Sequence, residues 1–194
     1  MKSGPRPMMQ VPRVVAALVL ALGPLALAAC ASGAPVDVPT LTVPDTIDVT
    51  SPAFANGAPL PASETCRGEG AFPAIRWSNL PDRTESIAVI VYDRDAEGGD
   101  YVHRLTTNLD PAAGSLPDAA TPSGAVEYET SNGQPGWTPP CPPAGSGTHH
   151  YLFTVLALDR TTRVPTSAHT QTAILTVTEA AFAQGTITAT VDAG

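Results

Sequence analysis

One run of consecutive apolar residues limits the folds open to this chain more than any other feature. Residues 87–92 read Ile-Ala-Val-Ile-Val-Tyr, rich in β-branched side chains and without a polar break. Side chains of a strand alternate between the two faces of a sheet, so a strand that is apolar throughout has to be covered on both faces. The run therefore predicts a central strand in a sheet that is packed on both sides.

Further strands are predicted on either side of this run. Residues 102–107 and 151–158 are two more strand candidates, and residues 186–191 alternate apolar and polar, which is typical of a strand with one wet face. Loops rich in proline and glycine, at 110–124 and 131–148, lie between the strands. The pattern indicates an all-β sandwich.

Helix is scarce. The best candidate is residues 176–184, where Thr176 and Glu179 have the spacing of a capping box and Gly185 suits the end of a helix. We therefore expect one or two short helices, one of them near the C-terminus.

The N-terminus has the pattern of an export signal. Three basic residues precede the apolar stretch 14–29, which is too short to span a bilayer and is interrupted by Gly23-Pro24. Leu27-Ala28-Ala29-Cys30 resembles the lipobox of bacterial lipoproteins, which implies cleavage before Cys30 and lipidation of its sulfur and new amino group. An ordinary cleaved signal with a chance cysteine is the alternative. We expect a signal peptide at 1–29 and a lipid-anchored protein on the extracytoplasmic face of the cell membrane.

The predicted mature chain is strongly acidic. It keeps all 18 acidic residues and 7 of the 10 basic ones, so its net charge is 7 − 18 = −11, and no lysine follows Lys2. This charge argues against nucleic acid and against electrostatic adsorption to anionic lipid, so the membrane anchor has to be the lipid itself. The small, prolyl and polar residues 30–45 predict a flexible tether, followed by one domain at 46–194.

Two cysteines remain besides Cys30. Cys66 and Cys141 can form a disulfide, because an exported protein folds in an oxidising compartment. Two buried free thiols are the alternative, and Cα atoms more than about 7 Å apart would exclude the bridge.

Polar groups gather at the ends of the predicted strands, in two segments of the chain. Polar groups are costly to bury at such places, which suggests a site. The residues concerned are Asp93, Asp95, His103, the prolines of 139–143, His149, His150 and Tyr151. Because strand side chains alternate, His149 and Tyr151 share one face and His150 points to the other. A carboxylate beside an imidazole favours the imidazolium, and two imidazoliums with a tyrosine hydroxyl would form a small anion receptor.

These segments resemble the two motifs of the phosphatidylethanolamine-binding protein family. Asp93-Arg94-Asp95-Ala96, followed by His103 to Asn108, is similar to the first motif. The second motif is filled by Pro140, Gly147, His149, His150 and Tyr151. Thr65-Cys66-Arg67-Gly68 and Pro73-Ala74-Ile75-Arg76-Trp77 resemble further segments of bacterial members, and the matches run in order from about residue 47 to 191.

The resemblance implies an antiparallel Greek-key sandwich with a pocket for a small anion or a phosphorylated or zwitterionic head group, such as phosphoethanolamine. It implies that the pocket is lined by Asp93, Asp95, His103, Pro140, His149 and Tyr151. We expect no cofactor and no enzymatic activity. Bacterial relatives are often dimers, which leaves a homodimer open. A zwitterion or small monoanion suits the acidic chain better than a polyanion. Departures from the family pattern predict a shifted ligand preference; they are Thr138 and Pro139 in place of glycines, Arg104 in place of an aromatic and Glu64 in place of a tyrosine.

Other functions are open from the sequence. The protein could inhibit a partner protein, a protease or a signalling kinase, through loops 110–124 or 131–148, or it could be a structural surface domain with a vestigial pocket. A zinc site of Asp93, His103 and His149 is chemically reasonable, but its spacing matches no zinc motif, so no metal is expected. Nucleophilic catalysis needs a serine or cysteine beside a base, and the predicted disulfide removes the two thiols, so no catalytic residue is expected.

Overall fold

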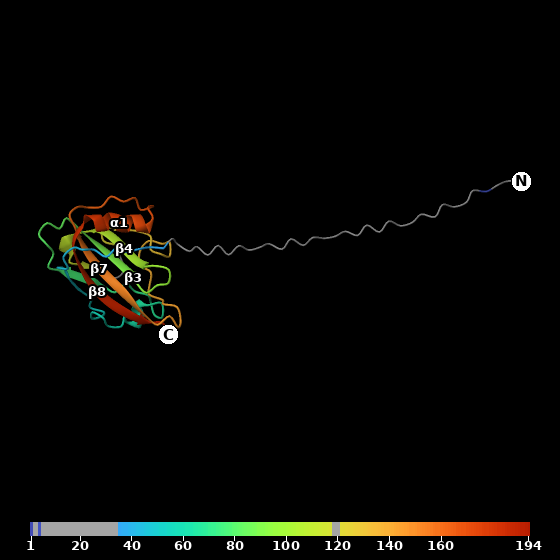
Figure 1. The fold of residues 1–194 in the computed structure, drawn as a ribbon, viewed down its shortest axis with the longest axis horizontal. Coiled ribbons are helices and arrows are strands. Elements are labelled where there is room, and N and C mark those ends of the chain that lie inside the picture. The colour runs from blue at the N-terminus through green and yellow to red at the C-terminus, as the bar shows by residue number, and fades with distance from the viewer. Residues whose placement is uncertain (2–3, 5–34, 118–120) are drawn as a thin grey trace. The chain divides into compact units, whose positions relative to one another are not determined.

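The computed structural model describes residues 1, 4, 35–117 and 121–194 (Figure 1). Nearly all of the predicted signal peptide and Cys30 lie outside the described residues, so the predictions for them stay predictions. No helix in the described part of the chain is both long and apolar enough to cross a membrane.

Two antiparallel sheets form the body of the protein. Five strands are ordered β6-β4-β3-β7-β8, and three short strands are ordered β1-β2-β5. The strands are β1 (Asp48–Thr50), β2 (Ile75–Ser78), β3 (Ser86–Asp93), β4 (Tyr101–Leu109), β5 (Ser115–Leu116), β6 (Val126–Glu127), β7 (Thr148–Leu158) and β8 (Ala181–Asp192). The helical elements are the 3-10 turns η1 (Ala62–Glu64) and η2 (Pro111–Ala113) and the helix α1 (Thr170–Ala180). The predicted all-β fold class is confirmed.

The apolar run at residues 87–92 lies in β3, the middle strand of the larger sheet, and all of β3 is buried. Ile87, Val89 and Val91 face a cluster between the sheets that includes residues of β2 and β7. The alternate residues of β3 face a second cluster, which includes Ile174 and Val177 of α1. Figure 1 shows α1 lying along the larger sheet. The helix and the smaller sheet therefore cover the two faces, as the unbroken apolar run requires.

The predicted helix boundaries are wrong. The helix begins at Thr170 and ends at Ala180, so the predicted capping residue Thr176 lies inside it, where its hydroxyl donates to the Thr172 carbonyl oxygen at 2.9 Å. The residues after Ala180 form β8 instead, because they pair with β7 along its whole length. Gly185 lies within β8 and not at a helix end; a Cβ there would come within 2.0 Å of the Ile47 carbonyl oxygen. Sheet pairing has overridden the local helix signal.

The predicted tether is also too long. Val36 and Val38 are only 8% and 6% exposed and belong to the apolar cluster beneath α1. The backbone N–H of Asp100 donates to the Val36 carbonyl oxygen at 3.0 Å, and Asp45 forms a bridge with Gln184. Residues 36–45 therefore form a strap that packs on the domain. The prolines of this stretch favour extended backbone, which a strap needs as much as a tether does.

Candidate functional site

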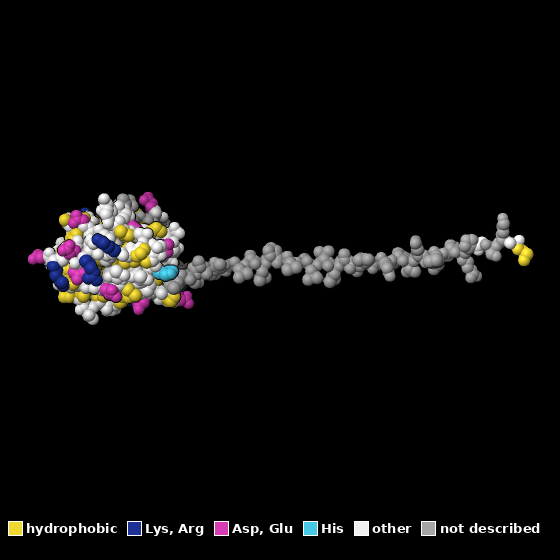
Figure 2. Space-filling model, turned by 90° about the horizontal axis from the view of Figure 1, so that it is seen from above, with side chains coloured by type: hydrophobic (Ala, Val, Ile, Leu, Met, Phe, Trp, Pro, Cys, Tyr) yellow, Lys and Arg dark blue, Asp and Glu magenta, His cyan; other side chains and the backbone are white. Residues whose placement is uncertain are grey.

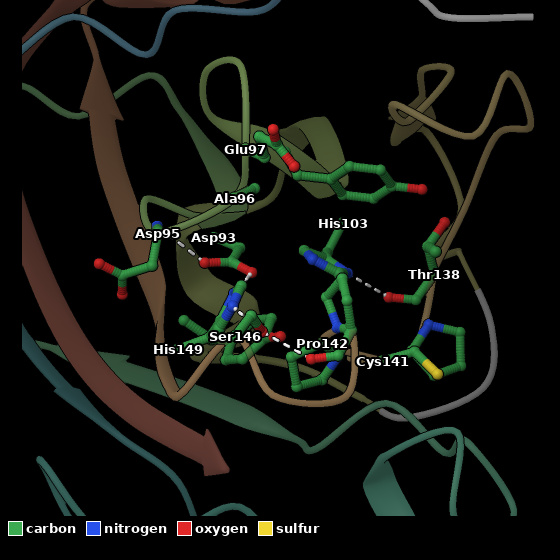
Figure 3. A pocket seen from close by; sticks show the side chains of 14 residues that line it. Asp93, Asp95, Ala96, Glu97, His103, Thr138, Cys141, Pro142, Ser146 and His149 are labelled. Carbon is green, nitrogen blue, oxygen red and sulfur yellow. Dashed lines mark hydrogen bonds and ion pairs between the residues drawn. The ribbon is translucent and has the colours of Figure 1, made fainter. Parts of the chain in front are cut away.

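A pocket of about 420 Å³ lies where β3, β4 and β7 carry their polar residues (Figure 3). Asp93 ends β3 and sits directly across from Tyr101 of β4 on one side and Tyr151 of β7 on the other. Alternate residues of a strand share a face, so His103 and His149, each two residues from its tyrosine, reach the same hollow. The strand register thus brings together side chains from three strands.

The strongest contact in the pocket joins His149 to Asp93. The His149 Nδ1 lies 2.7 Å from the Asp93 Oδ2, and the two side chains are 4% and 5% exposed. The other oxygen of Asp93, Oδ1, accepts from the Asp95 backbone N–H at 2.9 Å. On the far side of the ring, His149 Nε2 lies 2.8 Å from the Ser146 Oγ. Both ring nitrogens and both carboxylate oxygens therefore have partners, which fixes the imidazole in place.

His103 has a different electrostatic state. Its Nδ1 lies 2.7 Å from the Thr138 carbonyl oxygen, which can only accept, so this nitrogen carries the proton. Burial lowers the pKa of His103 to about 4, against the opposing effects of the Thr138 hydrogen bond and the Asp93 charge. The ring is neutral at pH 7, and its Nε2 is an acceptor. The prediction of two imidazoliums in the pocket is wrong for His103, because desolvation outweighs the nearby carboxylate.

Tyr151 lies at the bottom of the pocket and is 1% exposed. Burial, followed by the charge of Asp93 and a hydrogen bond to it, raises the pKa of the Tyr151 hydroxyl well above its usual range. The hydroxyl therefore stays protonated, and its single proton is directed to the Asp93 carboxylate.

Asp95 lines the pocket mouth, but its carboxylate is engaged by His150. The Asp95 Oδ2 accepts from the His150 backbone N–H at 2.7 Å and lies 2.8 Å from the ring Nδ1. Desolvation alone would raise the pKa of Asp95, but the hydrogen bonds and charge of His150 lower this pKa overall. His150 is exposed and does not line the pocket, in keeping with its predicted orientation.

The proline loop forms one wall of the pocket, although Pro140, the loop residue predicted to contact the ligand, is not part of that wall. Pro139, Pro142 and Pro143 line the pocket, whereas Pro140 is buried outside it and its carbonyl oxygen accepts from the Cys66 N–H at 3.0 Å. The prediction of Pro140 as a ligand contact is therefore wrong, because Pro140 is buried where the loop packs against Cys66. A disulfide joins Cys66 to Cys141, whose Cα atoms are 5.4 Å apart, and ties this wall to the η1 region.

Arg104, expected to shift ligand preference, does not line the pocket. Its guanidinium pairs with Glu127 and lies over the Phe72 ring, 4.3 Å from the ring centroid. The pairing of β3 with β4 shifts register at His103, so Arg104 lies opposite Val91 and faces the cluster between the sheets, beside the pocket but outside its lining.

Sequence reasoning missed several lining residues, namely Ala96, Glu97, Tyr101, Thr138, Cys141 and Ser146. Tyr101 could have been found, because it precedes His103 by two residues on the same strand. Ser146 carried a weaker signal, its place three residues before His149 in a Gly-Ser-Gly turn. In the part of the chain that the structure describes, no three His, Cys, Asp or Glu side chains are placed to hold a metal ion.

Comparison with known proteins decides the family. The sequence model for "Phosphatidylethanolamine-binding protein" matches residues 50–192, a stretch that contains all the polar residues of the pocket. The chain belongs to the phosphatidylethanolamine-binding protein family. Crystal structures of two family proteins superpose on it. The homologue CT736 from Chlamydia trachomatis has a TM-score of 0.69 at 28% identity, covering 76% of this chain and 97% of that one. Escherichia coli YbcL has a TM-score of 0.68 at 31% identity, covering 75% and 97%.

Two mycobacterial relatives within this family are closer in sequence. LppC of Mycobacterium tuberculosis, which carries the name of a lipoprotein, is 39% identical over 144 residues, 74% of this chain and 71% of LppC. A UPF0098 protein of Mycobacterium bovis is 41% identical over 150 residues, 77% of this chain and 72% of the relative. The lipoprotein name of LppC agrees with the lipobox resemblance at Cys30.

Proposed function

We propose that this protein is a lipid-anchored, extracytoplasmic receptor for a small zwitterionic or phosphorylated head group such as phosphoethanolamine. The observation that carries the proposal is the convergence of Asp93, His103, His149 and Tyr151 on one pocket with apolar walls. A pocket with mostly apolar walls and a few fixed polar groups is the usual form of a small-molecule site. Binding of this kind needs no bond-making step, so the primary role proposed is that of a receptor and not of an enzyme.

The charges of the pocket favour a zwitterion. Its lining contains the carboxylates of Asp93, Asp95 and Glu97 and no arginine or lysine. On the face in Figure 2 acidic side chains are scattered singly, with the basic ones toward one side. These carboxylates would repel a bare polyanion, whereas they attract an ammonium group.

The ligand groups can be matched to protein groups. In this proposal the ammonium lies near the exposed carboxylates of Asp95 and Glu97. A phosphoryl oxygen takes the place that the Ser146 hydroxyl holds beside His149 Nε2. The neutral His103 supplies an acceptor, which suits a ligand that also donates hydrogen bonds.

Isothermal titration of the full-length protein in a phosphate-free detergent tests the proposal. We expect heat with phosphoethanolamine, less with phosphate and least with acetate. His149→Gln should weaken phosphoethanolamine binding at least about tenfold, the loss of one charge-assisted hydrogen bond. His169→Gln, at an exposed position outside the pocket, is the matched control and should bind like the wild type. Absence of heat with all three ligands, or equal effects of the two variants, would refute the receptor role.

A further inference from the structure

Three pocket side chains are joined in series in Figure 3, namely Ser146, His149 and Asp93. The Ser146 Oγ lies 2.8 Å from His149 Nε2, and His149 Nδ1 lies 2.7 Å from Asp93 Oδ2. We propose that Ser146 is an activated nucleophile that accepts an acyl group from a carboxylic ester bound in the pocket. This activity goes beyond head-group binding and was not expected from the sequence, where only the two thiols were weighed as nucleophiles.

The arrangement meets the geometric requirements of nucleophilic catalysis. A nucleophile has to lie within hydrogen-bond reach of a base, and a third group has to orient that base. Asp93 is buried and cannot rotate freely, because its second oxygen is held by the Asp95 N–H. It therefore keeps the proton of a neutral His149 on Nδ1 and leaves Nε2 facing Ser146. Ser146 itself is exposed at the pocket mouth, where a substrate can reach it.

One carbonyl competes for the serine proton. The Ser146 Oγ also donates to the Pro143 carbonyl oxygen at 2.7 Å. Rotation about the Cβ–Oγ bond redirects the proton to Nε2 without moving a heavy atom. The Ser146 hydroxyl can therefore either donate to Pro143, which stabilises the turn, or donate to His149, which activates the serine as a nucleophile. The second state requires a neutral His149.

The reaction proceeds by acylation followed by hydrolysis. Ser146 Oγ forms a bond to the ester carbonyl carbon while its proton passes to His149 Nε2. The bond from that carbon to the alcohol oxygen breaks, and the leaving alcohol takes the proton from Nε2. A water molecule then repeats the sequence on the acyl-serine, which releases the carboxylic acid and restores Ser146.

In the proposed reaction the backbone N–H of Gly147, which follows the serine directly, donates to the developing oxyanion. The hydrogen bonds found among the described residues include none from the Gly147 backbone N–H. Gly147 has a φ of 92°, a conformation that glycine adopts without strain. The N–H of the residue after the nucleophile is a common member of an oxyanion hole. Since the lining is acidic, the substrate class is an ester with a neutral or ammonium-bearing alcohol and not one that carries a carboxylate.

Labelling of the full-length protein with a fluorophosphonate probe, located by peptide mass spectrometry, tests the proposal. General-base activation contributes at least about 100-fold, so Ser146 should react at least about 100-fold faster than the exposed Ser123, which lies outside the pocket. His149→Gln should slow the labelling of Ser146 to a similar extent, and Ser146→Ala should abolish the adduct. Ser123→Ala is the control and should leave the labelling of Ser146 unchanged.

The comparison of Ser146 with Ser123 in the wild-type protein tests the nucleophile proposal even where a variant fails to fold. If Ser146 reacts no faster than Ser123, or if folded His149→Gln is labelled at the wild-type rate, the nucleophile proposal is overturned. Release of p-nitrophenol from p-nitrophenyl acetate then reports the hydrolytic half of the cycle; a single burst without turnover would overturn the hydrolysis step. Phosphoethanolamine binding with an inert Ser146 would leave the receptor role standing, so the two failures are distinguishable.

Discussion

Asp93 and His149 form a buried contact of 2.7 Å, and a nearly equal contact of 2.8 Å joins Asp95 to His150, whose side chain lies on the opposite face of β7 from that of His149. The side chains of Asp93 and His149 are 5% and 4% exposed, whereas those of Asp95 and His150 are 43% and 53% exposed. The two pairs share their chemistry and differ in their burial, which makes one a control for the other.

Asp93→Asn should destabilise the protein far more than Asp95→Asn. Removal of one partner from a buried pair costs about 3 kcal/mol or more, because a polar or charged group is left without compensation. An exposed pair contributes less than about 1 kcal/mol. Urea denaturation at pH 7 measures both values, and equal losses in the two variants would show that the buried pair has no special role in stability.

His103 should make the protein less stable as the pH falls from about 6.5 to about 4. The folded-state pKa of His103 is lowered to about 4 from an ordinary 6.5, so in this window the unfolded chain binds a proton that the folded chain does not. The slope of unfolding free energy against pH is therefore positive, and the loss across the window is on the order of 3 kcal/mol. Below about pH 4 this contribution is constant.

Urea denaturation from pH 4 to pH 7 checks this slope in two variants. His103→Phe should remove the His103 contribution to the slope, whatever its effect on absolute stability. His169→Gln, at an exposed position before α1, should keep the wild-type slope. A His103→Phe slope equal to that of the wild type would contradict the assignment.

The disulfide should support the pocket as well as the fold. Cys66 and Cys141 are 75 residues apart in sequence, and a bridge over a loop of this size stabilises by about 2–4 kcal/mol. The double variant Cys66→Ser/Cys141→Ser should lose this amount in urea denaturation. It should also bind phosphoethanolamine several-fold more weakly, since Cys141 lines the pocket. Unchanged affinity in the folded double variant would mean that the proline wall holds its position without the bridge.

Arg104 should matter for stability and not for ligand binding. Arg104→Met leaves the Glu127 carboxylate largely buried without its cation and should cost about 3 kcal/mol. Arg104→Met/Glu127→Met removes both charges and should recover most of that loss. Calorimetry should give wild-type phosphoethanolamine affinity for the double variant. A changed affinity would revive the view that the residue after His103 sets ligand preference.

Features that depend on residue alternation could be predicted from the sequence. The unbroken apolar run placed β3 in the centre of the sheet, and the period of two separated His149 and Tyr151 from His150. The same rule would have added Tyr101 to the pocket.

Features that depend on burial or tertiary pairing could not be predicted. The charge state of His103 follows from how deeply the folded chain encloses it, which no local pattern reveals. Residues 181–184, with two alanines and a glutamine, favour helix but form the start of β8 because β7 offers a partner strand. The contact between Ser146 and His149 depends on the shape of a three-residue turn, so the spacing alone did not single out the serine.

The strap at residues 36–45 limits how far the proposed binding pocket can lie from a lipid on Cys30. Val36 is bridged to Asp100, the residue just before Tyr101 at the pocket. Val36 is six positions after Cys30, and a span of six positions can reach at most about 22 Å when fully extended. An acylated Cys30 would therefore hold the mouth of the pocket close to the leaflet that contains the lipid. The protein would then sample the phospholipids of its own bilayer in preference to solutes in the surrounding fluid.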